Sequence, residues 1–343
     1  MSAGATDPLH QKYTLDTGLR SFEHPSTARA VWQLANSLVP YLATLSLMYL
    51  TIRAGLPWWL TLALAVPASG FMVRVFILMH DCTHSSFLPS RRAERVLGRI
   101  LGVIVFTPFA EWGHEHLGHH ATSGDLDRRG IGDVWTMTVD EYAAAPRSKR
   151  IQYWATRTAP VMLLFGPPVI FLYNNRVPPR GASRQRVLSV VYTDLAIAAI
   201  VAVASLTIGL RAYLAIQMPV LFLGGVWGVW LFYVQHQFEP PYWVRGKDWS
   251  FVQAGLLGSS YFKLPKVLQW FSGNIGLHHV HHLRPRIPNY HLQRCLDATP
   301  ELQLAHPLTL TGSIGCARLG LWDEQAHTFV SFQAAARRRG AHG

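Results

Sequence analysis

The stretch Trp58–Met79, WWLTLALAVPASGFMVRVFILM, runs directly into His80-Asp-Cys-Thr-His84. Its apolar part is long enough to cross a hydrocarbon layer of ~30 Å, which needs about 20 apolar residues. The part that follows places His80 and His84 at positions i and i+4, on one face of a helix. The stretch therefore predicts a membrane span that ends in a pair of imidazoles.

Three further stretches have the length and composition of membrane spans: Val31–Ile52, Val187–Ile208 and Tyr213–Val234. Short turns join the four spans into two pairs. The chain between the pairs is rich in arginine, which is typical of cytoplasmic loops. We therefore predict an all-α integral membrane protein with four transmembrane helices in two hairpins. Both termini and the chain between the hairpins are expected on the cytoplasmic side.

Two shorter apolar runs, Val96–Phe109 and Ala159–Tyr173, lie between the hairpins. Each is too short for a regular span, and the second contains Gly166-Pro-Pro168. We interpret both as interfacial or re-entrant segments. The alternative that both cross the membrane stays open.

Composition supports a membrane protein, because half of the residues are apolar and only 15% are charged. The formal charge of +12 arises from arginines in short clusters between apolar segments, not along one face, so nucleic acid is not an expected partner. Cys82, Cys295 and Cys316 have no spacing typical of a disulfide framework or a thiolate zinc site. The first 30 residues lack the apolar core of a cleavable signal peptide. We expect a cytosolic segment over 1–30, one membrane domain over 31–300 and a cytosolic tail over 301–343.

Histidines form two further motifs of the type H-x-x-H-H, at 116–120 and 278–282, and one histidine follows the fourth span closely. Positions i, i+3 and i+4 lie on one side of a helix. Imidazole suits iron, zinc, copper and nickel, so the ligand type leaves the metal open. Nine ligands exceed the set that one ion takes, so two metal ions in a cytosolic helical cap are predicted. The candidate ligands are His80, His84, His116, His119, His120, His236, His278, His281 and His282.

Other polar residues near these motifs are candidates for additional ligands or for groups that orient the imidazoles. His114 and His279 project away from the shared faces of their motifs. An acid close to the motifs is also explained as a surface or capping residue. The polar candidates are His114, His279, Asp81, Glu111, Glu115, Asp125, Asp127, Glu239 and Asn274.

Tryptophans near the motifs have two readings. They could line a tunnel for a substrate, or they could lie at the membrane interface, where tryptophan is common. These residues are Trp112, Trp135, Trp243 and Trp270.

Two charged residues fall inside the predicted spans, Arg74 and Asp194. Counted at 1.5 Å per residue, both lie ~9–10 Å below the cytosolic boundary. Ionisable groups at such depth are costly and usually find a partner. We therefore expect a buried Arg74–Asp194 pair, with snorkelling of Arg74 as the alternative.

The order of the histidine motifs resembles the membrane fatty-acid desaturase superfamily. The stretches His119–Trp135 and Trp270–Tyr290 are similar to bacterial acyl desaturases of the Δ12/ω6 type, and the resemblance covers roughly residues 30–300. It implies a mushroom-shaped protein whose cytosolic cap holds two irons over a tunnel for an acyl chain. This chain departs from the family pattern at Pro240-Pro241, and Phe232 stands where the stearoyl-type branch has an asparagine ligand.

The activity that the resemblance implies is O2-dependent desaturation of a long-chain fatty acyl group. O2 needs four electrons and the substrate supplies two, so an external donor such as a ferredoxin or rubredoxin is expected. The acyl carrier, whether lipid, coenzyme A, carrier protein or free acid, stays open, and a bacterial inner membrane is the expected location. Alternatives with the same fold are a hydroxylase, an acetylenase and an alkene-forming decarboxylase. A metal transporter is disfavoured, because transport sites lie near the bilayer midplane.

Overall fold

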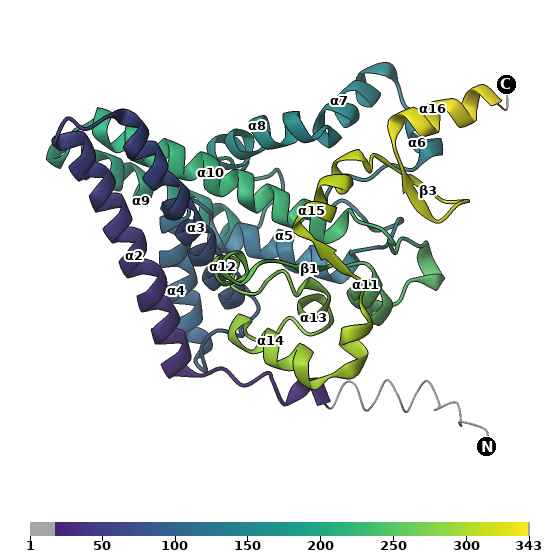
Figure 1. The fold of residues 1–343 in the computed structure, drawn as a ribbon, viewed down its shortest axis with the longest axis horizontal. Helices are drawn as coiled ribbons and strands as arrows, with labels where there is room; N and C mark the ends of the chain where they lie inside the picture. Colours follow the sequence, from purple (N-terminus) through teal and green to yellow (C-terminus); the bar gives the residue numbers. More distant parts are fainter. Residues whose placement is uncertain (1–17, 342–343) are drawn as a thin grey trace.

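Two long helical hairpins form the apolar part of the molecule (Figure 1). The computed structural model describes residues 18–341. The first hairpin pairs α2 (Thr27–Arg53) with α3 (Trp58–Thr83), and the second pairs α9 (Arg184–Thr207) with α10 (Leu210–His236). All four helices are long and apolar enough to cross a membrane. The predicted spans are thus confirmed as helices, with ends within about four residues of the predicted ones.

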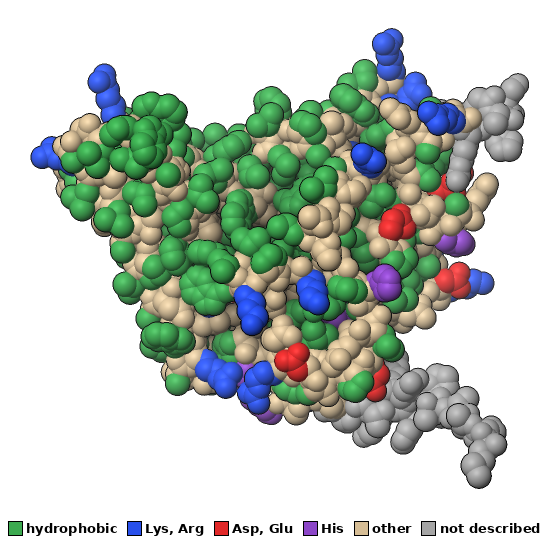
Figure 2. All heavy atoms as spheres, viewed as in Figure 1, with side chains coloured by type: hydrophobic (Ala, Val, Ile, Leu, Met, Phe, Trp, Pro, Cys, Tyr) green, Lys and Arg blue, Asp and Glu red, His purple; other side chains and the backbone are tan. Residues whose placement is uncertain are grey.

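Helix α3 is the centre of the hairpin bundle. It packs against α2, α10 and α4 (Arg91–Ile104), and most of its apolar window is buried. In contrast, α9 exposes Leu195, Val203 and Leu206, which are 66%, 62% and 88% accessible. Figure 2 shows hydrophobic side chains over much of the face formed by the hairpins. An apolar surface of this extent is typical of contact with lipid.

Two bent helix pairs lie between the hairpins. Helix α4 meets α5 (Phe109–Thr122) at 103°, and α7 (Arg147–Arg157) meets the continuous helix of α8 (Ala159–Val169) and η1 (Ile170–Asn174) at 88°. By length and composition each pair is either one broken span or a re-entrant segment. The two short apolar runs of the sequence therefore lie in bent pairs, and the number of crossings is four, or up to six.

The remaining elements are short and form most of the cap beside α5. Strands β1 and β2 pair in parallel, and β3 pairs antiparallel with β4. Helix α11 packs against α13, the helix of the third histidine motif. The bounds are α6 Val139–Ala144, η2 Gly246–Asp248, α11 Phe251–Leu257, β1 Tyr261–Lys263, α12 Lys266–Phe271, α13 His278–Leu283, α14 Asn289–Ala298, η3 Pro300–Leu304, β2 Pro307–Thr309, α15 Leu310–Ser313, η4 Ile314–Arg318, β3 Leu321–Asp323, β4 Thr328–Val330 and α16 Phe332–Ala341.

The expected C-terminal tail packs on the rest of the chain. Strand β2 pairs with β1, Tyr153 Oη donates to Gly320 O at 2.6 Å, and Arg157 Nη2 donates to Leu319 O at 2.8 Å. Of the expected N-terminal segment, residues 1–17 lie outside the described part of the chain. The domain boundaries at 30 and 300 stay a prediction.

The expected Arg74–Asp194 pair is wrong. Asp194 accepts a hydrogen bond from Arg176 Nη1, because the chain after η1 returns to the side of α9. Arg74 points toward α2 and α12, where its Nε donates to Ser37 Oγ at 3.0 Å and its Nη1 donates to Trp270 O. The two residues were expected to pair because they lie at similar depth in the predicted spans. Their side chains, however, point in different directions around their helices.

Candidate metal centre

Nine buried imidazoles gather in two groups whose candidate ligand atoms lie within 4.8 Å of one another in each group. Helices α3, α5, α10 and α13 or the residues that end them supply all nine. We call the groups cluster A and cluster B. Cluster A contains His80, His84, His116, His120 and His281, and cluster B contains His119, His236, His278 and His282.

The two H-x-x-H-H motifs exchange one histidine each between the clusters. We number the histidine motifs in chain order. Motif two (116–120) gives His116 and His120 to cluster A and His119 to cluster B. Motif three (278–282) gives His278 and His282 to cluster B and His281 to cluster A. Consecutive residues project about 100° apart around a helix. One helical turn of α5 or α13 can therefore serve two neighbouring sites.

The spacing of the ring nitrogens fits metal coordination. In cluster A, the Nε2 atoms of His116 and His84 are 3.0 Å apart, and those of His281 and His120 are 3.1 Å apart. In cluster B, the Nε2 atoms of His236 and His278 are 2.9 Å apart. Two imidazole nitrogens bound at right angles, each about 2.1 Å from one ion, would lie about 3.0 Å from each other.

Several buried nitrogens have no hydrogen-bond partner in the described part of the chain, and four of them belong to the clusters: His80 Nε2 and His120 Nδ1 in cluster A, and His278 Nδ1 and His282 Nε2 in cluster B. Buried polar atoms almost always have a partner. A metal ion in each cluster would supply one, so the donor set of both clusters fits a metal.

Burial favours the neutral form of five of the clustered imidazoles. Loss of hydration lowers the pKa of His116, His120, His278, His281 and His282 well below the usual value, and the neighbouring histidines lower it further. A neutral imidazole has a free lone pair, which is the form that binds a metal.

Carboxylates orient one imidazole in each cluster. Asp81 Oδ1 lies 3.2 Å from His80 Nδ1, and Asp133 Oδ1 lies 2.5 Å from His119 Nδ1. Asp81 Oδ2 also accepts from the backbone N and from Nδ2 of Asn289, both at 2.8 Å. Such contacts fix the ring so that Nε2 faces the cluster, and they raise the basicity of the ligand.

Asp133 was missed by sequence reasoning, although it lies in the stretch that carries the family resemblance. Gly132 has φ +65°, and a Cβ there would lie 2.4 Å from Glu115 O. Only glycine allows this close approach to α5. The carboxylate is held by Gly130 N, which donates to Oδ2 at 2.9 Å. The glycines of Gly130-Ile-Gly132-Asp133 were the signal available in the sequence.

The other polar candidates have partners away from the ring nitrogens. Arg186 donates to Glu111 at 2.7 and 2.8 Å and to Glu115 at 2.9 Å, which joins α9 to α5. His114 is exposed, and His279 is buried outside both clusters with Nε2 3.1 Å from Leu302 O. The remaining contacts are Asp125 with Arg128, Asp127 with Arg245, Glu239 with Thr328 and Phe329 N, and Asn274 with Asn289 O.

Aromatic rings cover parts of both clusters. Trp112 stacks on His116 with ring centroids 4.5 Å apart, and Phe232 contacts His119 and His236 at 5.2 and 5.3 Å. The other tryptophan candidates lie elsewhere: Trp135 packs on Tyr153, Trp243 belongs to a core group with Leu126, Trp322 and Phe329, and Trp270 lies over Arg74.

Comparison with known proteins gives a consistent result. The family model described as fatty acid desaturase matches residues 57–312. A fatty acid desaturase of Bacillus subtilis (strain 168) is 42% identical over 325 residues, 95% of this chain and 92% of the relative. The probable fatty acid desaturase DES1 of Sorghum bicolor is 28% identical over 80% of this chain and 71% of its own length. The chloroplastic sn-2 acyl-lipid omega-3 desaturase (ferredoxin) of Arabidopsis thaliana is 26% identical over 70% of this chain and 55% of its own length. This chain, a membrane oxidoreductase, therefore belongs to the fatty acid desaturase family.

Proposed function

We propose that this chain desaturates a long-chain fatty acyl group with O2 at a di-iron centre held by the nine histidines of clusters A and B. The observation that carries the proposal is the pair of adjacent buried clusters, five and four imidazoles, in a chain of this family. One ion would not use nine nitrogen ligands.

A bound pair of ferrous ions would supply the oxidation, because two irons can reduce O2 and remove hydrogen from unactivated methylenes. The neutral imidazoles provide the lone pairs that hold the ions. Asp81 and Asp133 keep His80 and His119 in the tautomer that presents Nε2 to the cluster. Trp112 and Phe232 keep water away from the imidazoles that they cover.

The substrate and the donor are also part of the proposal. The name of the Arabidopsis relative, an sn-2 acyl-lipid desaturase with ferredoxin, supports an acyl chain carried on a membrane lipid and a ferredoxin or a rubredoxin as donor. Exposed arginines between the hairpins, such as Arg91, Arg92 and Arg147, suit an acidic donor. The Δ12/ω6 resemblance stays an expectation about the position of the double bond.

The topology that we propose places clusters A and B and both described chain ends on the cytoplasmic side of a bacterial inner membrane. The support is the arginine-rich chain between the hairpins together with a single Arg at each far-side turn, Arg53 and Arg211. Within this topology, residues 31–300 are the desaturase domain, flanked by cytosolic segments 1–30 and 301–343.

The test combines elemental analysis of the detergent-purified protein with fatty-acid profiles of cells that express wild type or His119→Ala. We expect about two irons per chain, and a new unsaturated fatty acid that the variant does not produce. One zinc or no metal together with an unchanged lipid profile would refute the proposal. Mass spectrometry of the product separates loss of two hydrogens from gain of oxygen, loss of four hydrogens or loss of one carbon.

A further inference from the structure

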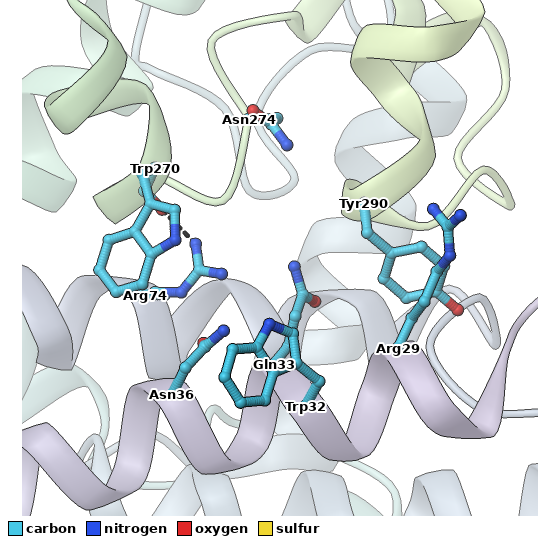
Figure 3. A pocket seen from close by; sticks show the side chains of 8 residues that line it. All are labelled: Arg29, Trp32, Gln33, Asn36, Arg74, Trp270, Asn274 and Tyr290. Atoms are coloured by element: carbon cyan, nitrogen blue, oxygen red, sulfur yellow. Dashed lines mark hydrogen bonds between the residues drawn. The ribbon is translucent and has the colours of Figure 1, made fainter.

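A cavity of about 400 Å³, bordered by two arginines, lies beside α3, and none of the nine clustered histidines lines it. Helix α2 forms one wall with Arg29, Trp32 and Asn36, and Arg74 of α3 lies opposite Trp270 of α12 (Figure 3). None of these residues contributes to the metal centre. The cavity is therefore a separate feature, at the contact of α2 and α3 with the cap residues Trp270, Asn274 and Tyr290.

Arg74 is a buried cation without an anion. Its side chain is 3% exposed, and among the described residues no carboxylate lies within ion-pair distance. Its hydrogen bonds go to neutral acceptors, Ser37 Oγ and Trp270 O, and the guanidinium lies 4.0 Å from the centre of the Trp270 ring. An unpaired charge inside a membrane span is costly unless a counter-charge is present. The third nitrogen, Nη2, is left to bind a ligand in the cavity.

Two more donors border the same space. The Arg29 guanidinium forms no ion pair or hydrogen bond within the described chain, and Asn36 uses only its Oδ1, which accepts from Ser37 Oγ. Gln33, between them on α2, has both amide atoms bound to Asn289 and does not compete for a ligand. Figure 3 shows Arg74 beside Asn36, and Arg29 on the other side of Gln33. Two cations and one amide donor thus face one cavity that holds no acid.

The surroundings of the cavity indicate which anion it takes. Trp32, on the candidate span α2, is 68% exposed, and Trp270, on the short helix α12, is 37% exposed. Indole rings in such a position are typical of the level of lipid headgroups. Arginine is a preferred partner of phosphate oxygens. We propose that this cavity binds the phosphodiester of a membrane phospholipid, with Arg74 and Arg29 donating to its oxygens. This inference does not rest on the proposed reaction, because it concerns a site apart from the metal.

A binding experiment on the purified full chain tests the ligand. Native mass spectrometry in detergent would titrate phosphatidylglycerol, diacylglycerol with the same acyl chains, and inorganic phosphate as a competitor. We expect one tightly bound phosphatidylglycerol per chain, at least about 10-fold weaker binding of diacylglycerol, and no displacement by millimolar phosphate. Equal binding of diacylglycerol would overturn the proposal, because the phosphate would then contribute nothing. Displacement by inorganic phosphate would also overturn it, in favour of a soluble anion.

Variants test the residues. Asn36→Asp keeps the shape of the side chain and places a carboxylate in the cavity, so it should weaken phosphatidylglycerol binding about 10-fold or more. Arg29→Gln removes an exposed charge that has no partner among the described residues, and it should also weaken binding, even if Asn36→Asp fails to fold. Arg53→Gln, an exposed arginine at the other end of α2, is the matched control and should bind like wild type. Wild-type affinity in Arg29→Gln and in folded Asn36→Asp would refute the site. Because binding is measured without turnover, such a failure leaves the proposed desaturation untouched.

Discussion

His120 and His282 stack face to face, with ring centroids 4.0 Å apart and 19° between the planes, although each belongs to a different cluster. They are the i+4 residues of motifs two and three. The two clusters are therefore in direct contact through these stacked rings. Loss of a ligand in one cluster is expected to disturb the ring that borders the other.

Metal content should depend on whether cluster B loses His119 or cluster A loses His281. His119→Ala leaves three protein nitrogens in cluster B, whereas His281→Ala leaves four in cluster A. We expect His119→Ala to fall from about two to about one iron per chain and His281→Ala to keep more, because affinity rises with the number of ligands. Elemental analysis measures both. His114→Ala, an exposed neighbour in sequence, is the control, and equal iron in all three variants would contradict the cluster assignment.

Asp133→Asn should weaken metal binding without removing a ligand. The amide can donate a hydrogen bond to His119 Nδ1 and so favour the wrong tautomer, and loss of such partners typically costs 10–100-fold in affinity. Competition with a chelator for the bound metal measures this change. Asp127→Asn, which removes a carboxylate that pairs with Arg245 on the surface, should match wild type. If the Asp133→Asn protein kept full affinity for the metal, the contact between Asp133 and His119 would have no role in metal binding.

Arg186→Gln should destabilise the cap, because it leaves the buried Glu111 carboxylate without its two charged hydrogen bonds. The expected loss is about 2–3 kcal/mol in the free energy of unfolding, reduced from the cost for a fully buried pair because Arg186 is partly exposed. Thermal unfolding in detergent measures it. The double variant with Glu111→Gln should recover part of the stability, and Arg184→Gln, an exposed neighbour, should have no effect. A double variant less stable than Arg186→Gln would argue against the pair.

Reversal of charges should distinguish the true partner of Asp194. Arg176→Asp and Asp194→Arg should each lower the thermal stability, by about 1–2 kcal/mol or more, since each sets like charges side by side. The combined exchange should restore much of the loss. An exchange of Arg74 with Asp194 should restore none, because Arg74 contacts Ser37 and Trp270 instead. Restoration by this second exchange would contradict the structure.

The sequence alone predicted the four long helices and that the nine histidines lie close together. Both predictions depend on local regularities of the sequence. The length of an apolar run indicates a span, and the spacing of His116, His119 and His120 indicates one helical face. The division into clusters was not predictable in this way. Which of His119 and His120 meets His236 depends on how α5, α10 and α13 pack, and helical spacing carries no information about that packing.

Two further outcomes show the same limit. Asp81, beside His80 in sequence, does contact that ring, but Glu111 and Glu115 next to motif two bind Arg186 instead. Asp133 contacts His119 from 14 positions away, through a turn that contains glycine. Arg74 and Asp194 were paired by depth alone. Depth follows from counting residues, but the direction of a side chain around its helix follows from tertiary contacts.

The hydrogen bonds between Asp81 and Asn289 join positions that are 208 residues apart in the chain. Cluster A likewise needs His84 from the first hairpin and His281 from α13. At a synthesis rate of about 5–20 residues per second, the first hairpin is complete roughly 10–40 s before the last ligands leave the ribosome. During that interval His80 and His84 of motif one lack His281, the histidine that α13 supplies to cluster A. The metal ions that we propose would therefore bind only after the residues of α13 have been synthesised, so the first hairpin must reach the membrane without them.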